Sequence, residues 1–91
     1  MVSVRTTPTF RRSVKRLHRR QKTDLDNAVR AIAEEPMAGA AKRGDLTGVR
    51  VFKFRMNNQH TLLAYQEIEG EGVIKLLALG SHENFYRDLK R

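Results

Sequence analysis

The stretch Val49–Met56 (VRVFKFRM) decides the fold, because its side chains alternate with a period of two. A β-strand places successive side chains on opposite faces of a sheet, so this pattern predicts a strand with two different faces. The face that needs a cover is apolar and comprises Phe52, Phe54 and Met56. Lys53 and Arg55 point the other way. We therefore expect a sheet that is covered on one face and cationic on the other.

Two more strands are predicted after this one. Asn57-Asn58 suits a tight hairpin turn, because asparagine tolerates positive φ. His60–Tyr65 follows and is largely apolar on both faces, as expected of a central strand. Glu69–Gly72 is typical of a second turn, and Val73–Leu79 of the last strand. Together the three strands predict an antiparallel meander.

The N-terminal half predicts a short strand followed by two helices. Residues 2–5 alternate in polarity, and Thr7-Pro8 is typical of an N-cap followed by proline at the first helical position. The first helix is expected to run to about residue 21, and the second from Thr23-Asp24 to a stop before Pro36. Residues 37–48 are interpreted as a loop. Each helix has one apolar stripe, so the helical hairpin is expected to cover the apolar sheet face.

The stretch Gly80–Arg87 (GSHENFYR) follows the last predicted strand. Gly80 lets the backbone turn and Ser81 is a good N-cap, so we expect a short C-terminal helix. Helical periodicity places four side chains on one arc: His82, Phe85, Tyr86 and Leu89. This helix is expected to dock through its apolar residues and to carry an imidazole and a phenol on the same side.

Length and composition predict one domain, residues 1–91, with a single modest core. No segment approaches the roughly 20 apolar residues of a membrane span, and we expect no secretion signal. The chain has no cysteine, which excludes disulfides and thiolate metal sites and suits the cytoplasm. Its three histidines lack a nearby carboxylate cluster, so neither a metal site nor a cofactor is expected.

The charge is the most informative part of the composition, with 18 Lys and Arg against 10 Asp and Glu, a net charge of +8. This excess favours a polyanionic partner, either nucleic acid or an acidic protein. The alternative is a solvated basic surface that keeps the protein soluble.

A cationic sheet face beside the C-terminal helix predicts a groove that binds a phosphodiester. Lys53 and Arg55 would hold phosphate, and His82 and Tyr86 would transfer protons. Each residue also has an ordinary interpretation: a solvated strand face for the first two, a helix start for His82 and a core edge for Tyr86. Only their conjunction indicates chemistry.

The order of elements and several motifs resemble the RelE/ParE toxin superfamily of bacterial type II toxin–antitoxin systems. The resemblance covers nearly the whole chain and rests on Glu35-Pro36, Lys42–Gly48, Arg50 with the basic strand, Leu62–Tyr65 and Gly80-Ser81-His82. It implies the RelE-like α+β fold: a short N-terminal strand and a helical hairpin packed on one face of an antiparallel sheet, with a short C-terminal helix.

Two activities occur in this superfamily. RelE-like and YafQ-like members cut mRNA in the ribosomal A site without metal, through the 2′-hydroxyl, whereas ParE-like members poison DNA gyrase. Both are neutralised by an acidic antitoxin in a heteromeric complex. This chain is nearest to the first group, which implies a cytoplasmic mRNA interferase, an endoribonuclease that inhibits translation and growth. The alternatives are a gyrase inhibitor without chemistry of its own, and an inert member that only binds RNA or its antitoxin.

The resemblance also implies roles for single residues. Lys53 lies where such nucleases place a catalytic histidine or lysine, and Arg55 where they place phosphate-holding residues. His60 aligns roughly with an acidic catalytic position, whereas Leu62 stands where many members carry arginine. The expected catalytic set is His82, Tyr86, Lys53, Arg55 and His60. The expected nucleic-acid contacts are Arg50, Arg12, Arg16, Arg19 and Arg87.

Overall fold

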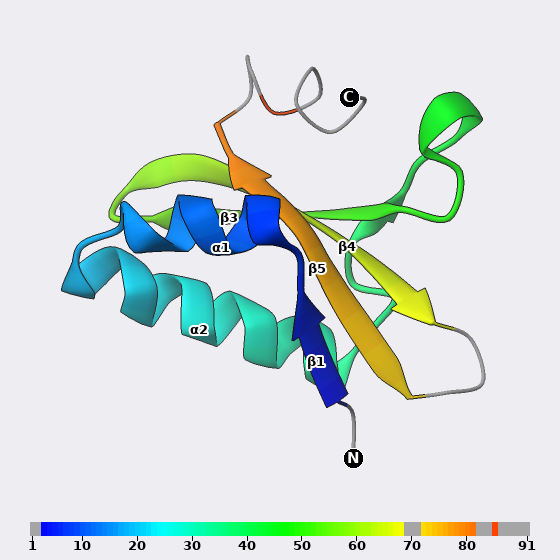
Figure 1. Ribbon diagram of the computed structural model, residues 1–91, viewed down its shortest axis with the longest axis horizontal. Helices are drawn as coiled ribbons and strands as arrows, with labels where there is room; N and C mark the ends of the chain where they lie inside the picture. Colours follow the sequence, from blue (N-terminus) through cyan, green and yellow to red (C-terminus); the bar gives the residue numbers. More distant parts are fainter. Residues whose placement is uncertain (1–2, 69–71, 82–84, 86–91) are drawn as a thin grey trace.

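The computed structural model describes residues 3–68, 72–81 and 85, and within them two α-helices cover one face of a five-stranded sheet (Figure 1). The sheet order is β1-β5-β4-β3-β2. The elements are β1 (Ser3–Thr6), α1 (Pro8–Lys15), α2 (Arg19–Glu34), β2 (Ala40–Ala41), the 3-10 turn η1 (Gly44–Leu46), β3 (Arg50–Met56), β4 (Gln59–Ile68) and β5 (Val73–Gly80). The expected α+β fold, with a helical hairpin on one sheet face, is confirmed.

The sheet is mixed rather than wholly antiparallel. β1 pairs with β5 in parallel, while β3, β4 and β5 form the expected antiparallel meander. β2 lies inside the segment interpreted as a loop, where Ala40 and Ala41 pair with Val51 and Arg50. A strand of two alanines has no alternation to read, so only the pairing itself reveals it.

The break between the two helices lies earlier in the chain than the sequence pattern predicts. α1 ends at Lys15 and α2 begins at Arg19, whereas the first helix was expected to run to about residue 21. His18 is the N-cap of α2, and its backbone N–H donates to Gln21 Oε1 at 3.0 Å in a capping box. Histidine is not a preferred N-cap residue, which explains why the boundary was misplaced.

The two faces of β3 are divided as predicted. Met56 is buried against the helices, and Phe52 and Phe54 pack on the same core with ring centroids 6.1 Å apart. The buried residues of this helix-side core are Phe10, Leu25, Ile32, Met56, Leu63, Tyr65, Ile74 and Leu76. α1 packs mainly on β5 and α2 on β3 (Figure 1). Neither α1 nor α2 packs on the other sheet face, which is called the open face below.

A β-bulge in β5 changes which side chains reach that open face. Tyr65 pairs with Leu76 and Ala64 with Ala78, so Leu77 is an extra residue without a partner on β4. Its carbonyl accepts a hydrogen bond from Thr7 Oγ1 at 2.8 Å, and the same hydroxyl caps α1 by accepting from the Phe10 N–H. Because the alternation shifts by one residue, Ala78 and Gly80 face the open side.

Tyr65 holds the connection between α2 and β2. Its fully buried hydroxyl donates to the Pro36 carbonyl at 2.6 Å and accepts from the Gly39 N–H at 2.8 Å. A Cβ added to Gly39 would lie 2.7 Å from atoms of the Tyr65 ring and hydroxyl, so this close approach requires glycine. The segment before β2 is therefore fixed to the centre of the sheet.

We expect Tyr65→Phe to lower the free energy of unfolding by about 1–3 kcal/mol, because two buried backbone groups lose their partner. Burial raises the pKa of Tyr65 above 10.0, although the Gly39 hydrogen bond and Arg50 act in the opposite direction. The unfolded chain would thus ionise this hydroxyl near pH 10 while the folded chain keeps it neutral. Below pH ~10 the hydroxyl contributes fully to the free energy of unfolding. This contribution is lost as the pH rises through the pKa of Tyr65 in the folded chain.

Urea denaturation of both proteins at several pH values measures this effect. The stability difference between them should shrink above pH ~10, since the variant has no group to ionise at this position. A difference that stays constant with pH would contradict the assignment to the buried hydroxyl.

Candidate functional site

A second apolar cluster lies on the open face of the sheet. It consists of Val51, Leu62, Ala64, Ala78 and Phe85, with Val49 and Leu77 packed beside it. Phe85 is only 3% exposed, and a Cβ on Gly80 would lie 3.7 Å from its ring. The predicted docking through Phe85 is confirmed, on the face that also carries the basic residues. Leu89 and the rest of the predicted terminal helix lie outside the described residues.

The register of the β3–β4 hairpin brings three of the predicted site residues together. Lys53 pairs with Leu62, and Arg55 pairs with His60. Paired residues of an antiparallel ladder point to the same face, so Lys53, Arg55 and His60 share the open face with Phe85. All three are exposed. Two cations and an imidazole therefore line the outer surface of one hairpin.

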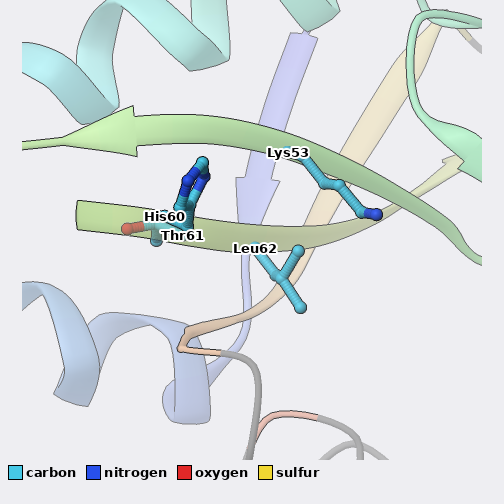
Figure 2. A pocket seen from close by; sticks show the side chains of 4 residues that line it. All are labelled: Lys53, His60, Thr61 and Leu62. Carbon is cyan, nitrogen blue, oxygen red and sulfur yellow. The ribbon is translucent and has the colours of Figure 1, made fainter. Parts of the chain in front are cut away.

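This surface is hollowed beside Lys53. A pocket of about 260 Å³ is lined by Lys53, His60, Thr61 and Leu62, which come from two neighbouring strands (Figure 2). A second pocket, of about 310 Å³, lies where β2 ends and is lined by Ala38, Ala40, Lys42, Val51, Phe52 and Lys53. Lys53 borders both pockets.

Leu62, which lines the first pocket, was not predicted as part of the site, although the hairpin turn in the sequence indicates its position. Asn57 and Asn58 both have positive φ, as a two-residue hairpin turn requires. Counting back from that turn pairs Met56 with Gln59 and then Lys53 with Leu62. The register therefore follows from the turn alone.

The other predicted site residues lie elsewhere. His82, Tyr86 and Arg87 are outside the described residues. The predicted RNA contacts on the helix layer are all exposed and comprise Arg12, Arg16 and Arg19. Arg50 is half-buried, and its guanidinium donates to the Gly39 carbonyl at 2.8 Å and to the Met37 carbonyl at 3.4 Å. These bonds give Arg50 a structural role in the segment before β2.

In the part of the chain that the structure describes, the His, Asp and Glu side chains form no group of three or more that could hold a metal ion. None of the helices in this part is long and apolar enough to span a membrane.

Known proteins share this architecture. The model of one family, described as ParE-like toxin of type II bacterial toxin-antitoxin system, matches residues 4–90. A chain of the intact RelBE toxin–antitoxin complex of E. coli is 17% identical, with a TM-score of 0.73 over 91% of this chain and 99% of that one. A chain of the RelBE2 complex of Mycobacterium tuberculosis is 22% identical, with a TM-score of 0.74 over 89% and 98%.

The isolated RelE toxin of E. coli is also similar, with 17% identity and a TM-score of 0.70 over 100% of this chain and 98% of that chain. At such identities these structures support the fold. No curated protein matches the chain significantly in sequence.

Proposed function

The chain belongs to the ParE-like toxin family of type II bacterial toxin–antitoxin systems, and on this premise we propose that it is a ribosome-dependent endoribonuclease. It would cleave mRNA and so inhibit translation and growth, acting in the cytoplasm. One observation carries the proposal: Lys53, Arg55 and His60 share the open sheet face, where Lys53 and His60 line a pocket of about 260 Å³. Cations beside an imidazole suit the cleavage of a phosphodiester.

In the proposed reaction, side chains of this protein supply the acid, the base and the cations, and the RNA supplies the nucleophile. An imidazole, from His82 or His60, or else the Lys53 amine, takes the proton from the 2′-hydroxyl, and O2′ attacks the neighbouring phosphorus. The P–O5′ bond breaks, and the 5′ oxygen leaves with a proton that Tyr86 or another acid supplies. The products are a 2′,3′-cyclic phosphate and a 5′-hydroxyl. Lys53 and Arg55 offset the charge that develops on the phosphorane oxygens.

The ribosome would supply the positioning that this small face lacks. Three exposed groups on a hairpin cannot orient a single-stranded RNA alone, so free RNA is expected to be cut poorly. Arg12, Arg16 and Arg19 lie on the helix layer, across the sheet from Lys53, and would contact the rRNA backbone instead. Such contacts weaken as salt rises. We also propose RNA contacts for Arg87, and for Arg50 in addition to its bonds to the segment before β2.

We propose a cognate acidic antitoxin as the protein partner, in a heteromeric complex. The net charge of +8 suits an acidic chain, and two of the similar structures are toxin–antitoxin complexes. An antitoxin that covers the open face would block Lys53 and Arg55 at once.

A second function is inhibition of DNA gyrase without chemistry of its own. It is favoured by Leu62, a 4% exposed member of the apolar cluster, which stands where many members of the superfamily carry an arginine. The matching family model is also described as ParE-like. This function would use the same fold for binding alone.

A cleavage assay on translating ribosomes and an induction experiment in cells distinguish these two functions. Purified toxin added to programmed ribosomes should cut mRNA within the A site and leave a 2′,3′-cyclic phosphate, while the same mRNA without ribosomes stays largely intact. In cells, induction should stop translation before any DNA-damage response begins. DNA-damage signalling with intact mRNA would instead identify a gyrase inhibitor, and unaffected growth would identify a chain that only binds.

A further inference from the structure

A hydrogen bond joins α2 to the tip of the β3–β4 hairpin. Asn57, the first residue of the turn, donates its backbone N–H to Asp24 Oδ2 at 2.8 Å. The ladder does not use this N–H, because Met56 and Gln59 form the closing pair of the hairpin. Asp24 is half-buried and precedes Leu25, which is in the helix-side core. The carboxylate therefore links a fixed helix to a turn at the edge of the molecule.

The same turn is contacted a second time from α2. His18, the N-cap of the helix, places its Nε2 3.5 Å from the side-chain nitrogen of Asn57. The backbone of His18 is itself held by Gln21 through the capping box. Both the main chain and the side chain of Asn57 thus face the start of α2.

The hairpin tip carries Arg55 and His60, the pair next to the closing pair. Both side chains are exposed, and among the described residues no hydrogen bond or ion pair is formed by either. The backbone of the tip therefore sets where the two side chains leave the sheet and in which direction. Met56 packs in the helix-side core from the opposite face of the tip.

We infer that Asp24 is a positioning residue, which fixes the direction of Arg55 and His60 through Asn57. The inference rests on the proposed ribonuclease function. A carboxylate acceptor on α2 holds the turn at one angle to the open face, so both side chains meet the same phosphate of the RNA. Asp24 lies on the opposite layer and does not touch the substrate.

Matched variants test this role on ribosomes. Asp24→Ala, Asp24→Asn and Asp26→Ala each remove one negative charge, and Asp26 is exposed on the same helix. Asp24→Ala should lower kcat by about 10–100-fold with little change in KM, because a small displacement of catalytic groups slows chemistry. Asp24→Asn keeps an acceptor and should restore most of kcat. Asp26→Ala should behave as the wild type. Equal kcat for Asp24→Ala and Asp26→Ala would overturn the inference.

Amide exchange and the His60 ring signal, followed by NMR, give a second readout. In Asp24→Ala the Asn57 amide should exchange faster and the His60 ring signal should move, whereas both stay unchanged in Asp26→Ala. If the wild type leaves mRNA intact, the proposed function fails and these signals alone decide the role of Asp24. If Asp24→Ala does not fold, Asp24→Glu takes its place, because glutamate keeps the charge and shifts the acceptor. An unchanged kcat in Asp24→Glu would then refute the inference. If the wild type does not cleave mRNA, unchanged NMR signals in Asp24→Glu would refute it instead.

Discussion

Lys53→Ala is expected to reduce mRNA cleavage on ribosomes by about 10²–10⁴-fold, the loss that follows removal of a group acting in the transition state. Lys53 borders both pockets of the open face and pairs with Leu62, which belongs to the same apolar cluster as Phe85. Its exposed side chain contributes little to folding, so the variant should unfold at the same urea concentration as the wild type.

Lys75→Ala is the matched control for this prediction. Lys75 is exposed on β5 and pairs with Gln66, away from the pocket beside His60. It removes the same charge, so any general loss of affinity for RNA appears in both variants. Single-turnover cleavage at saturating toxin separates chemistry from binding. A Lys53→Ala rate equal to that of Lys75→Ala would remove Lys53 from the mechanism.

Phe85→Ala is expected to lower the free energy of unfolding by about 3–5 kcal/mol, the usual cost of truncating a buried phenylalanine. Its ring covers Leu62, Ala64 and Ala78, so their side chains would meet water. Urea denaturation measures the loss. Phe85→Leu keeps most of the apolar contact and should lose much less.

Phe85→Ala also distinguishes an effect on folding from an effect on cleavage. Phe85 lies three residues after His82 in the sequence and one residue before Tyr86. If these two residues act in catalysis, cleavage at low temperature should fall in Phe85→Ala even where the domain remains folded and Lys53 is intact. Full activity in the folded variant would show that the anchoring of Phe85 is not needed for the reaction.

The sequence predicted the parts of the fold that rest on local patterns. Alternation assigned Phe52 and Lys53 to opposite faces, and the Asn57-Asn58 turn set the hairpin. Features that depend on distant partners could not be read in the same way. The parallel pairing of β1 with β5 joins residues about 70 positions apart, and β2 exists only through its pairing with β3.

The candidate site was predictable to a similar degree. Lys53 and Arg55 were identified from the alternation of one strand and His60 from the family resemblance, and the hairpin register brings all three to one face. Asp24 was missed, since nothing near it in the sequence shows that its carboxylate reaches Asn57, 33 positions later. The structural role of Arg50 was missed for the same reason, because its acceptors lie in the segment before β2.

Leu77, the extra residue in β5, determines which face of the sheet the side chains after it meet. Each residue in a strand reverses the side to which the next one points, so the count between Leu76 and Gly80 decides which sheet face Ala78 and Gly80 meet. With Leu77 inserted, these two residues lie on the face of Lys53 beside Phe85, while Leu79 packs toward the helices. Thr7, at the other end of the sequence, accommodates the insertion by binding the Leu77 carbonyl. The N-cap of α1 and the face that Ala78 and Gly80 offer to Phe85 therefore depend on the same extra residue.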